Sequence, residues 1–208
     1  MNEVIDADVV IMVTTPNHAT YCISTTAIRT CAASTKHRVH VMHNTTPPGE
    51  FRDKIRKECE LLGVNYIYRE EKFSMAGFFN DAIRMTTGKY IALANADVIF
   101  FPNWLENIVE LWEENPEYFC LCNFSFDSNN HACTKQGVTL EKRIVPTHNP
   151  SSGVTVFKRS NGFFWDEQFP FWEMDADLTY YMESRGLKAG YCLNARADHL
   201  ICGIRPHI

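Results

Sequence analysis

Short apolar runs alternate with helix-like segments over the first half of the chain, and this alternation restricts the possible fold more than any other feature. Runs rich in β-branched residues are typical of buried strands, whereas apolar residues three and four positions apart are typical of helices. A repeating strand–helix order predicts an α/β protein with a mainly parallel central sheet flanked by helices. The expected strands are Val9–Val13, Arg38–Met42, Val64–Tyr68, Tyr90–Ala94 and Phe119–Cys122, and the expected helices are Ala19–Ala33, Glu50–Leu62, Phe78–Met85 and Pro102–Glu113.

The second half of the chain is less regular. Ser151–Phe157 is expected to form a further strand and Leu178–Ser184 a short helix. The long polar segment Asp127–Pro150 indicates a flap or lid outside the sheet. The length of 208 residues fits a single domain over 1–208.

The overall composition is that of a globular protein with a substantial core. Hydrophobic residues make up 45% of the chain, and the formal net charge is −5, which disfavours a protein that wraps nucleic acid nonspecifically. No run approaches the roughly 20 apolar residues that cross a bilayer, and the first residues lack the basic-then-apolar order of a secretory signal. These features predict a soluble, cytoplasmic protein without a transmembrane segment.

The eight cysteines support the same compartment. Most of them lie inside apolar runs, which favours buried free thiols in a reducing environment over a disulfide framework. No Cys-x-x-Cys pair occurs, and a structural zinc site is therefore not expected.

An aspartate, Asp97, follows the apolar strand Tyr90–Ala94. Parallel sheets bind ligands at the carboxyl ends of their strands, so this carboxylate is expected to face a binding crevice. Hard cations such as Mg²⁺ and Mn²⁺ take oxygen ligands and often share them with substrate phosphates. A divalent-metal ligand is one interpretation of Asp97, and a strand-end aspartate that caps a turn is the other.

A second acidic cluster, Glu173, Asp175 and Asp177, lies among aromatic residues that include Trp172. Aromatic surroundings tend to raise the pKa of a carboxylate and suit a general base. The acids also suit a helix N-terminus, where they meet the positive end of the helix dipole, and both interpretations can hold together. His199 is isolated in the sequence, and such a histidine is more often a satisfied core or surface residue.

In their order and spacing these segments resemble family 2 of the GT-A glycosyltransferases. Asn95–Asp97 resembles the metal-binding "DxD" string, with asparagine in place of the first acid. Glu173–Leu178 resembles the family's Gly-Glu-Asp-x-Asp-Leu string, and Ala195–Leu200 resembles its late Ala-x-x-x-His-Leu string. The resemblance spans roughly residues 8–200 and implies the GT-A fold of nucleotide-diphospho-sugar transferases, with a nucleotide-binding half at about 8–100 and an acceptor-binding half at about 101–208.

The resemblance also implies an activity and a metal. It predicts an inverting hexosyl- or pentosyltransferase in which Asp97 and His199 bind Mn²⁺ or Mg²⁺ and Asp175 is the catalytic base. Trp172 and Glu173 are expected to contact the sugar or the acceptor, although core packing explains Trp172 equally well.

On the donor side, the resemblance implies a pocket for a nucleotide-diphosphate sugar. His43 stands where the family carries an acid that meets the nucleotide base, which puts the base selectivity in question. The residues expected to line the donor pocket are Thr14, Pro16, Asn17, Asn44, Asn80 and Asn95.

Two other functions compete with this interpretation. A nucleotidyltransferase needs a Gly-rich basic loop after the first strand, and Thr14–His18 does not provide one. A noncatalytic or degenerate nucleotide-sugar- or carbohydrate-binding module fits the same strings and stays as the alternative. The acceptor is left open between a soluble glycan, a protein and, as a minority option, a hydroxylated DNA base.

Overall fold

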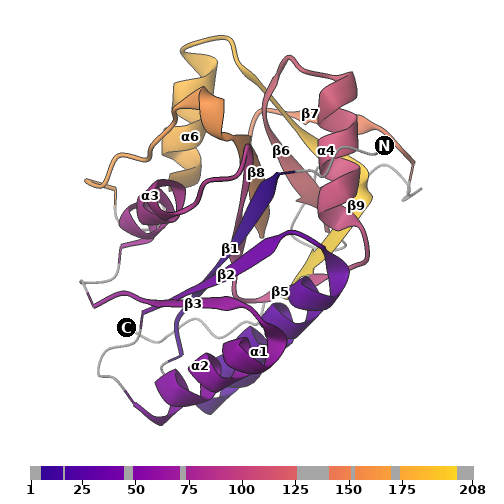
Figure 1. The fold of residues 1–208 in the computed structure, drawn as a ribbon. Coiled ribbons are helices and arrows are strands. Elements are labelled where there is room, and N and C mark those ends of the chain that lie inside the picture. Colours follow the sequence, from indigo (N-terminus) through magenta and orange to yellow (C-terminus); the bar gives the residue numbers. More distant parts are fainter. Residues whose placement is uncertain are drawn as a thin grey trace.

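The structure, a computed structural model, is built around one large sheet (Figure 1). It describes residues 6–15, 17–44, 49–70, 74–125, 141–150, 153–169 and 174–200. The strands are β1 (Ala7–Val13), β2 (Arg38–His43), β3 (Asn65–Tyr68), β4 (Tyr90–Asn95), β5 (Val98–Phe100), β6 (Tyr118–Phe124), β7 (Ile144–Thr147), β8 (Val154–Lys158) and β9 (Lys188–His199). The helices are α1 (His18–Ser34), α2 (Glu50–Leu62), α3 (Met75–Met85), α4 (Trp104–Glu114) and α6 (Met174–Glu183), with a 3₁₀ turn at Arg159–Asn161.

The sheet has a parallel half and a mixed half. Its described strands follow the order β3-β2-β1-β4-β8-β6-β9-β5, and β7 pairs with β9. The first four strands of this order are parallel, as the strand–helix repeat predicts. Beyond β4 the order is mixed, because β8 runs antiparallel to both β4 and β6. The α/β class is therefore confirmed, and the parallel arrangement is concentrated in the first half of the chain.

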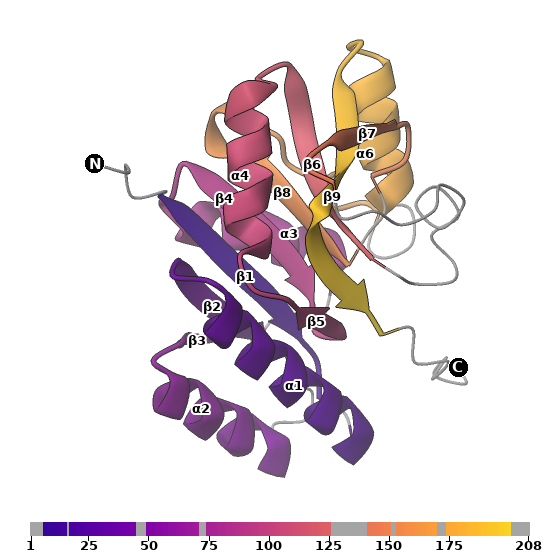
Figure 2. The ribbon, with the colours of Figure 1, turned by 90° about the vertical axis from the view of Figure 1, so that its right-hand side faces the viewer.

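Side chains on β1 show how the sheet is covered on both faces. Val9, Ile11 and Val13 belong to one core cluster, and Val10 and Met12 belong to the other, in keeping with the two-residue period of a strand. Helices α1, α2 and α4 cover the first face, whereas α3 and α6 cover the second (Figures 1 and 2). Because both faces of β1 are buried, a ligand can meet this part of the sheet at the strand ends.

Strands β9 and β5 were not predicted from the sequence. Strand β9 is the longest described strand and pairs with β6, β7 and β5, although its sequence mixes Gly, Asn, Arg and Asp and lacks an apolar run. Strand β5 has three residues, and among the described strands β9 is its one partner. These strands exist through their tertiary partners, which a local pattern does not reveal.

Strand β7 corrects part of the predicted flap. Residues 141–150 of that segment are described, and Ile144–Thr147 pairs antiparallel with β9 as part of the sheet. The prediction of a flap is therefore wrong for this part, because the sheet edge offers hydrogen-bond partners that a polar sequence can still use. Residues 127–140 of the predicted flap lie outside the described residues.

No helix within the described ranges combines the length and the apolar character that crossing a bilayer requires.

Candidate active site

The first pair of interest joins two residues that the sequence separates by 102 positions. Asp97 lies in the turn between β4 and β5, and His199 is the last residue of β9. Because Val98 of β5 is opposite His199 in the antiparallel ladder, the two side chains meet at one corner of the sheet. The Nε2 atom of His199 lies 3.0 Å from Oδ1 of Asp97.

Backbone hydrogen bonds hold both partners of this pair in place. The His199 N–H donates to Oγ of Ser125 at 3.0 Å, and the Leu200 N–H donates to the carbonyl oxygen of Asp97 at 2.6 Å. The side chains keep 35% (Asp97) and 24% (His199) of their surface exposed, so a ligand can reach both. Ser125 was not singled out in the sequence, but it follows β6 as Asp97 follows β4, and that position is the signal that points to it.

The pair has the chemistry of a partial site for a divalent cation. A carboxylate oxygen and an imidazole nitrogen are both ligands of Mn²⁺, and a cation bound through two protein groups leaves positions for phosphate oxygens. Within the described residues no group of three or more His, Cys, Asp or Glu side chains is arranged to hold a metal alone. The residues present therefore fit a cation that is shared with a phosphate-bearing ligand.

Asn95 lies at the carboxyl end of β4, next to this pair. Its backbone N–H donates to the carbonyl oxygen of Gly153 at 2.9 Å, and its side chain is partly exposed. The strand register puts Asn95 beside Met12 of β1. Asn95 therefore lies between the Asp97–His199 corner and the loop that follows β1.

Thr14, Asn17 and Asn44 lie at the carboxyl ends of β1 and β2. Thr14 is partly exposed, and Asn17 caps α1, with its side chain accepting the Thr20 N–H at 3.0 Å. Asn44 is buried, and its side-chain amide donates to the carbonyl oxygen of Arg69 at 2.8 Å. These three predicted donor-binding residues gather at one edge of the sheet, while Pro16 lies outside the described residues.

His43, the residue at the family's acid position, lies beneath this edge rather than on it. Its side chain is fully buried, with Nε2 2.7 Å from the Thr15 hydroxyl and Nδ1 3.0 Å from the Tyr66 hydroxyl. Burial, together with the nearby charge of Arg52, lowers the pKa of His43 to about 4. The imidazole is therefore neutral at pH 7 and hydrogen-bonded on both nitrogens, which suits a structural role beneath this edge of the sheet.

Asn80 also lies below the surface, in α3, with 2% of its surface exposed. Its side-chain amide donates to the Trp165 carbonyl and to Oε1 of Glu167, both at 2.9 Å, and its oxygen accepts the Trp165 N–H at 2.9 Å. Both the nitrogen and the oxygen of this amide are therefore hydrogen-bonded to other protein groups. The arrangement gives no support to the prediction that Asn80 contacts the donor.

Asp175 lies in the first turn of α6 and is exposed. Asp177 shares that turn, so both acids lie where the helix dipole favours negative charge. In the described part of the chain, no hydrogen bond or ion pair joins Asp175 to Asp97 or His199, and the role of Asp175 stays a prediction. Trp172 and Glu173 lie outside the described residues.

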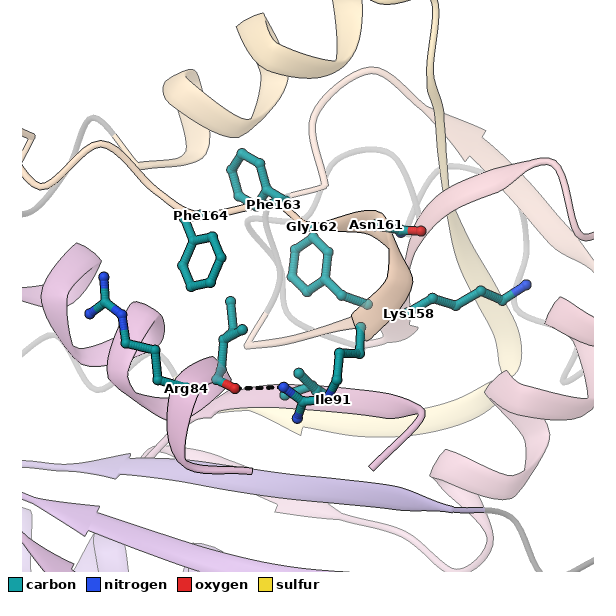
Figure 3. A pocket seen from close by; sticks show the side chains of 10 residues that line it. Arg84, Ile91, Lys158, Asn161, Gly162, Phe163 and Phe164 are labelled. Carbon is teal, nitrogen blue, oxygen red and sulfur yellow. Dashed lines mark hydrogen bonds between the residues drawn. The ribbon is translucent and has the colours of Figure 1, made fainter. Parts of the chain in front are cut away.

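A separate pocket of about 190 Å³ lies at the opposite end of β4 (Figure 3). It is lined by Ile91 at the start of that strand, by Ile83 and Arg84 of α3, and by Phe163 and Phe164. Ile91 precedes Asn95 by roughly 13 Å of strand, so this pocket is remote from the Asp97–His199 corner. None of the described residues that were predicted to bind the donor lines it.

Comparison with known proteins places these features in a family. The family model described as "Glycosyl transferase family 2" matches residues 49–174. That match includes Asp97 and ends just before Asp175, so Asp175 and His199 lie beyond it. A stretch of 63 residues is 44% identical to the "Cellulose synthase catalytic subunit [UDP-forming]" of Pseudomonas fluorescens (strain SBW25). It covers 30% of this chain and 8% of that protein.

Two solved structures share the fold at low sequence identity. GalNAc-T7, crystallised with UDP, GalNAc and Mn²⁺, superposes with a TM-score of 0.71 at 12% identity, over 93% of this chain and 43% of the other. Residues 1–349 of S. aureus TarS superpose with a TM-score of 0.63 at 15% identity, over 91% of this chain and 58% of the other. The chain thus spans about half the length of these structures, and the likeness confirms the predicted GT-A fold.

Proposed function

Because the chain belongs to glycosyl transferase family 2, we propose that it transfers a sugar from a nucleotide-diphosphate sugar to an acceptor hydroxyl with the help of a divalent cation. The observation that carries the proposal is the approach of His199 to Asp97 at the carboxyl edge of the sheet. Two potential metal ligands from distant parts of the chain meet there, at the edge where parallel sheets bind their ligands.

In this proposal Asp97 and His199 hold the cation, which is Mn²⁺ or Mg²⁺. A cation bound there supplies positive charge beside the donor diphosphate and so stabilises the leaving group. The similar structure of GalNAc-T7 contains Mn²⁺, which supports manganese as the first metal to test. Asn95 lies beside this position and is the nearest of the predicted donor-binding residues along the chain.

Asp175 is proposed as the base of an inverting transfer. Its carboxylate takes the proton of the acceptor hydroxyl, whose oxygen forms a bond to the anomeric carbon while the bond to the diphosphate oxygen breaks. The attack comes from the face opposite the leaving group, so the configuration at that carbon inverts. The exposure of Asp175 supports this role, because the base must reach an acceptor that arrives from solvent.

A UDP-sugar is the proposed donor. UDP occurs in the names of two similar proteins, the cellulose synthase subunit and the GalNAc-T7 structure. Thr14, Asn17 and Asn44 lie at the edge where its nucleotide would bind. Because His43 is buried and hydrogen-bonded to Thr15 and Tyr66, the base is proposed to meet the neighbouring backbone instead.

The acceptor is proposed only as a hydroxyl compound, with a soluble glycan, a protein and a hydroxylated DNA base as the three classes to screen. A screen of acceptors from each class with radiolabelled UDP-sugars separates them by the product that carries the label.

Calorimetry together with a hydrolysis assay tests the proposed function against a noncatalytic binding module. The protein is titrated with UDP in the presence and absence of Mn²⁺, and UDP-sugar turnover is measured in parallel. Metal-dependent UDP binding with turnover is expected. Metal-dependent binding without turnover of any UDP-sugar would support the binding module, and metal-independent binding would contradict the role of Asp97 and His199.

A further inference from the structure

Asn80 of α3 is linked to the first turn of α6 through the backbone of Trp165 and Asp166. We infer that this link, named here the Asn80–Asp177 brace, positions Asp175 for proton transfer. Asn80, Trp165, Asp166 and Asp177 form the brace. The inference rests on the proposed function, since it assumes that Asp175 is the catalytic base.

The first part of the brace is the side chain of Asn80, which pairs with Trp165 as a neighbouring strand would. It donates to the Trp165 carbonyl oxygen and accepts from the Trp165 N–H, both at 2.9 Å. The described segment 162–169 belongs to no helix or strand. The Asn80 side chain therefore supplies the hydrogen bonds that the Trp165 backbone would otherwise make to a neighbouring strand. A buried amide used in this way fixes the backbone of Trp165, because leaving those groups unpaired is costly.

Aromatic packing holds the same segment from the other side. Trp165 is 6% exposed, and its ring centroid lies 4.8 Å from that of Phe163, 5.1 Å from that of Phe79 and 5.4 Å from that of Phe157. Phe79 belongs to α3 and Phe157 to β8, so the indole is enclosed by two elements of the core. Through Phe79, Trp165 is thereby tied to α3, the helix that precedes β4 in the parallel half of the sheet.

The second part of the brace joins this segment to α6. The Asp166 N–H donates to Oδ2 of Asp177 at 3.0 Å. Asp177 and Asp175 are two positions apart in the helix, which corresponds to a rotation of roughly 200° about its axis. When Asp177 is held against the 162–169 segment, Asp175 is turned to the other side of α6.

Apolar packing alone would not fix this rotation. Leu178 and Met182, both nearly fully buried, attach α6 to the core. Such contacts are non-directional and tolerate a small turn of the helix, whereas a hydrogen bond to a carboxylate has a preferred geometry. The Asp166–Asp177 bond therefore sets the orientation of the turn that carries Asp175.

The inference is tested with Asp177→Ala, which removes the acceptor, and Asp177→Asn, which keeps an oxygen for the Asp166 N–H. Glu183→Ala, an exposed change at the far end of α6, is the matched control. Asp177→Ala is expected to lower kcat by about 10- to 100-fold, because small misplacements of a catalytic group cost that much. The KM for the UDP-sugar and the Mn²⁺-dependent affinity for UDP should stay within about twofold, and Asp177→Asn should restore most of kcat.

Hydrogen exchange of the amides in 163–169 and 178–182 gives a readout that does not need activity, because the amides of α6 are bonded within the helix from Leu178 onward. Lost protection in Asp177→Ala, together with normal protection in Asp177→Asn and Glu183→Ala, supports the brace. Unchanged protection and unchanged kcat in Asp177→Ala overturn it, as does a parallel loss of UDP affinity and kcat. If the wild-type protein turns over no UDP-sugar, the proposed function fails, and exchange alone then decides whether Asp177 orients α6.

Asn80→Asp examines the other end of the brace. The aspartate still accepts the Trp165 N–H but cannot donate to its carbonyl, and it adds a negative charge beside Glu167. The same kcat loss with unchanged KM and the same loss of protection at 178–182 are expected. Normal protection in this variant would show that Asn80 of α3 does not influence the orientation of α6.

Discussion

His199 and Asp97 are in contact because β5 and β9 pair antiparallel, which places the Nε2 atom of one 3.0 Å from the Oδ1 atom of the other. The ladder positions the backbone of both residues at the same corner of the sheet. When the side chains that bind a metal are already oriented, binding requires less ordering of the protein and costs less conformational entropy. We therefore expect metal binding to depend on this corner of the sheet as well as on the two side chains.

The first prediction concerns the charge of Asp97. Asp97→Asn keeps the shape of the side chain and removes the negative charge that holds a divalent cation. A loss of about 100-fold or more in kcat/KM for the UDP-sugar is expected, since a metal supplies several kcal/mol of transition-state stabilisation. The measurement is initial rate against Mn²⁺ concentration.

Asp198→Asn is the matched control for this change. Asp198 precedes His199 in β9 but forms an ion pair with Arg196 at 2.6 Å instead of facing Asp97. Its replacement should leave the Mn²⁺ dependence intact. Equal losses in the two variants would show that general damage to this corner, and not metal binding, explains the effect of Asp97→Asn.

A second prediction uses the close approach of Gly153 to the same corner. A Cβ atom at Gly153 would lie 2.6 Å from Cγ2 of Val98 and 3.2 Å from the ring of His199. Gly153→Ala is thus expected to push the imidazole away from Asp97 and to destabilise the fold by about 1–3 kcal/mol, as overpacking usually does. Calorimetric Mn²⁺ and UDP affinities should weaken together with the free energy of unfolding. Full metal affinity in this variant would show that the corner is more adaptable than the contact distances imply.

The sequence predicted the parallel half of the fold well, because that half is encoded locally. The predicted bounds of the helix Glu50–Leu62 equal the observed ones, and Gly63 ends it with a positive φ of 67°, as expected for a terminal glycine. The apolar runs of β1 and β4 likewise identify these segments as strands from the sequence. Strand β9 has no such run, and its polar residues form a strand because they pair with β6, β7 and β5.

The candidate site was predicted unevenly for a comparable reason. The family strings identified Asp97 and His199, and the structure brings them together. The same strings offered Asn80 and His43 as positions near the donor, but both side chains are buried and hydrogen-bonded to protein groups. A string specifies a residue type and its place along the chain, whereas the direction of its side chain depends on packing partners such as Trp165 and Tyr66.

A third prediction concerns Asp175. Asp175→Asn removes the basic carboxylate and preserves the size of the side chain, so transfer should fall by about 10²- to 10⁴-fold, as expected when a general base is lost. UDP binding in the presence of Mn²⁺ should remain unchanged. Single-turnover rates and calorimetry on the same preparation measure the two effects. Transfer at the wild-type rate would contradict the assignment of Asp175 as the base.

The last prediction is a pH dependence of stability that originates at His43. Its pKa is about 4 in the folded protein, chiefly because the imidazole is buried, compared with 6.5 for an ordinary histidine. Between these values the unfolded chain binds a proton that the folded protein does not, so the free energy of unfolding falls as the pH drops from 6.5 towards 4. A shift of this size corresponds to about 3 kcal/mol. Urea unfolding at several pH values should show the decline in the wild type and a smaller decline in His43→Gln, which retains hydrogen-bonding groups for Thr15 and Tyr66 without titrating. His18→Gln, at an exposed position on α1, controls for the loss of a histidine, and an equal decline in all three proteins would assign the effect to other groups.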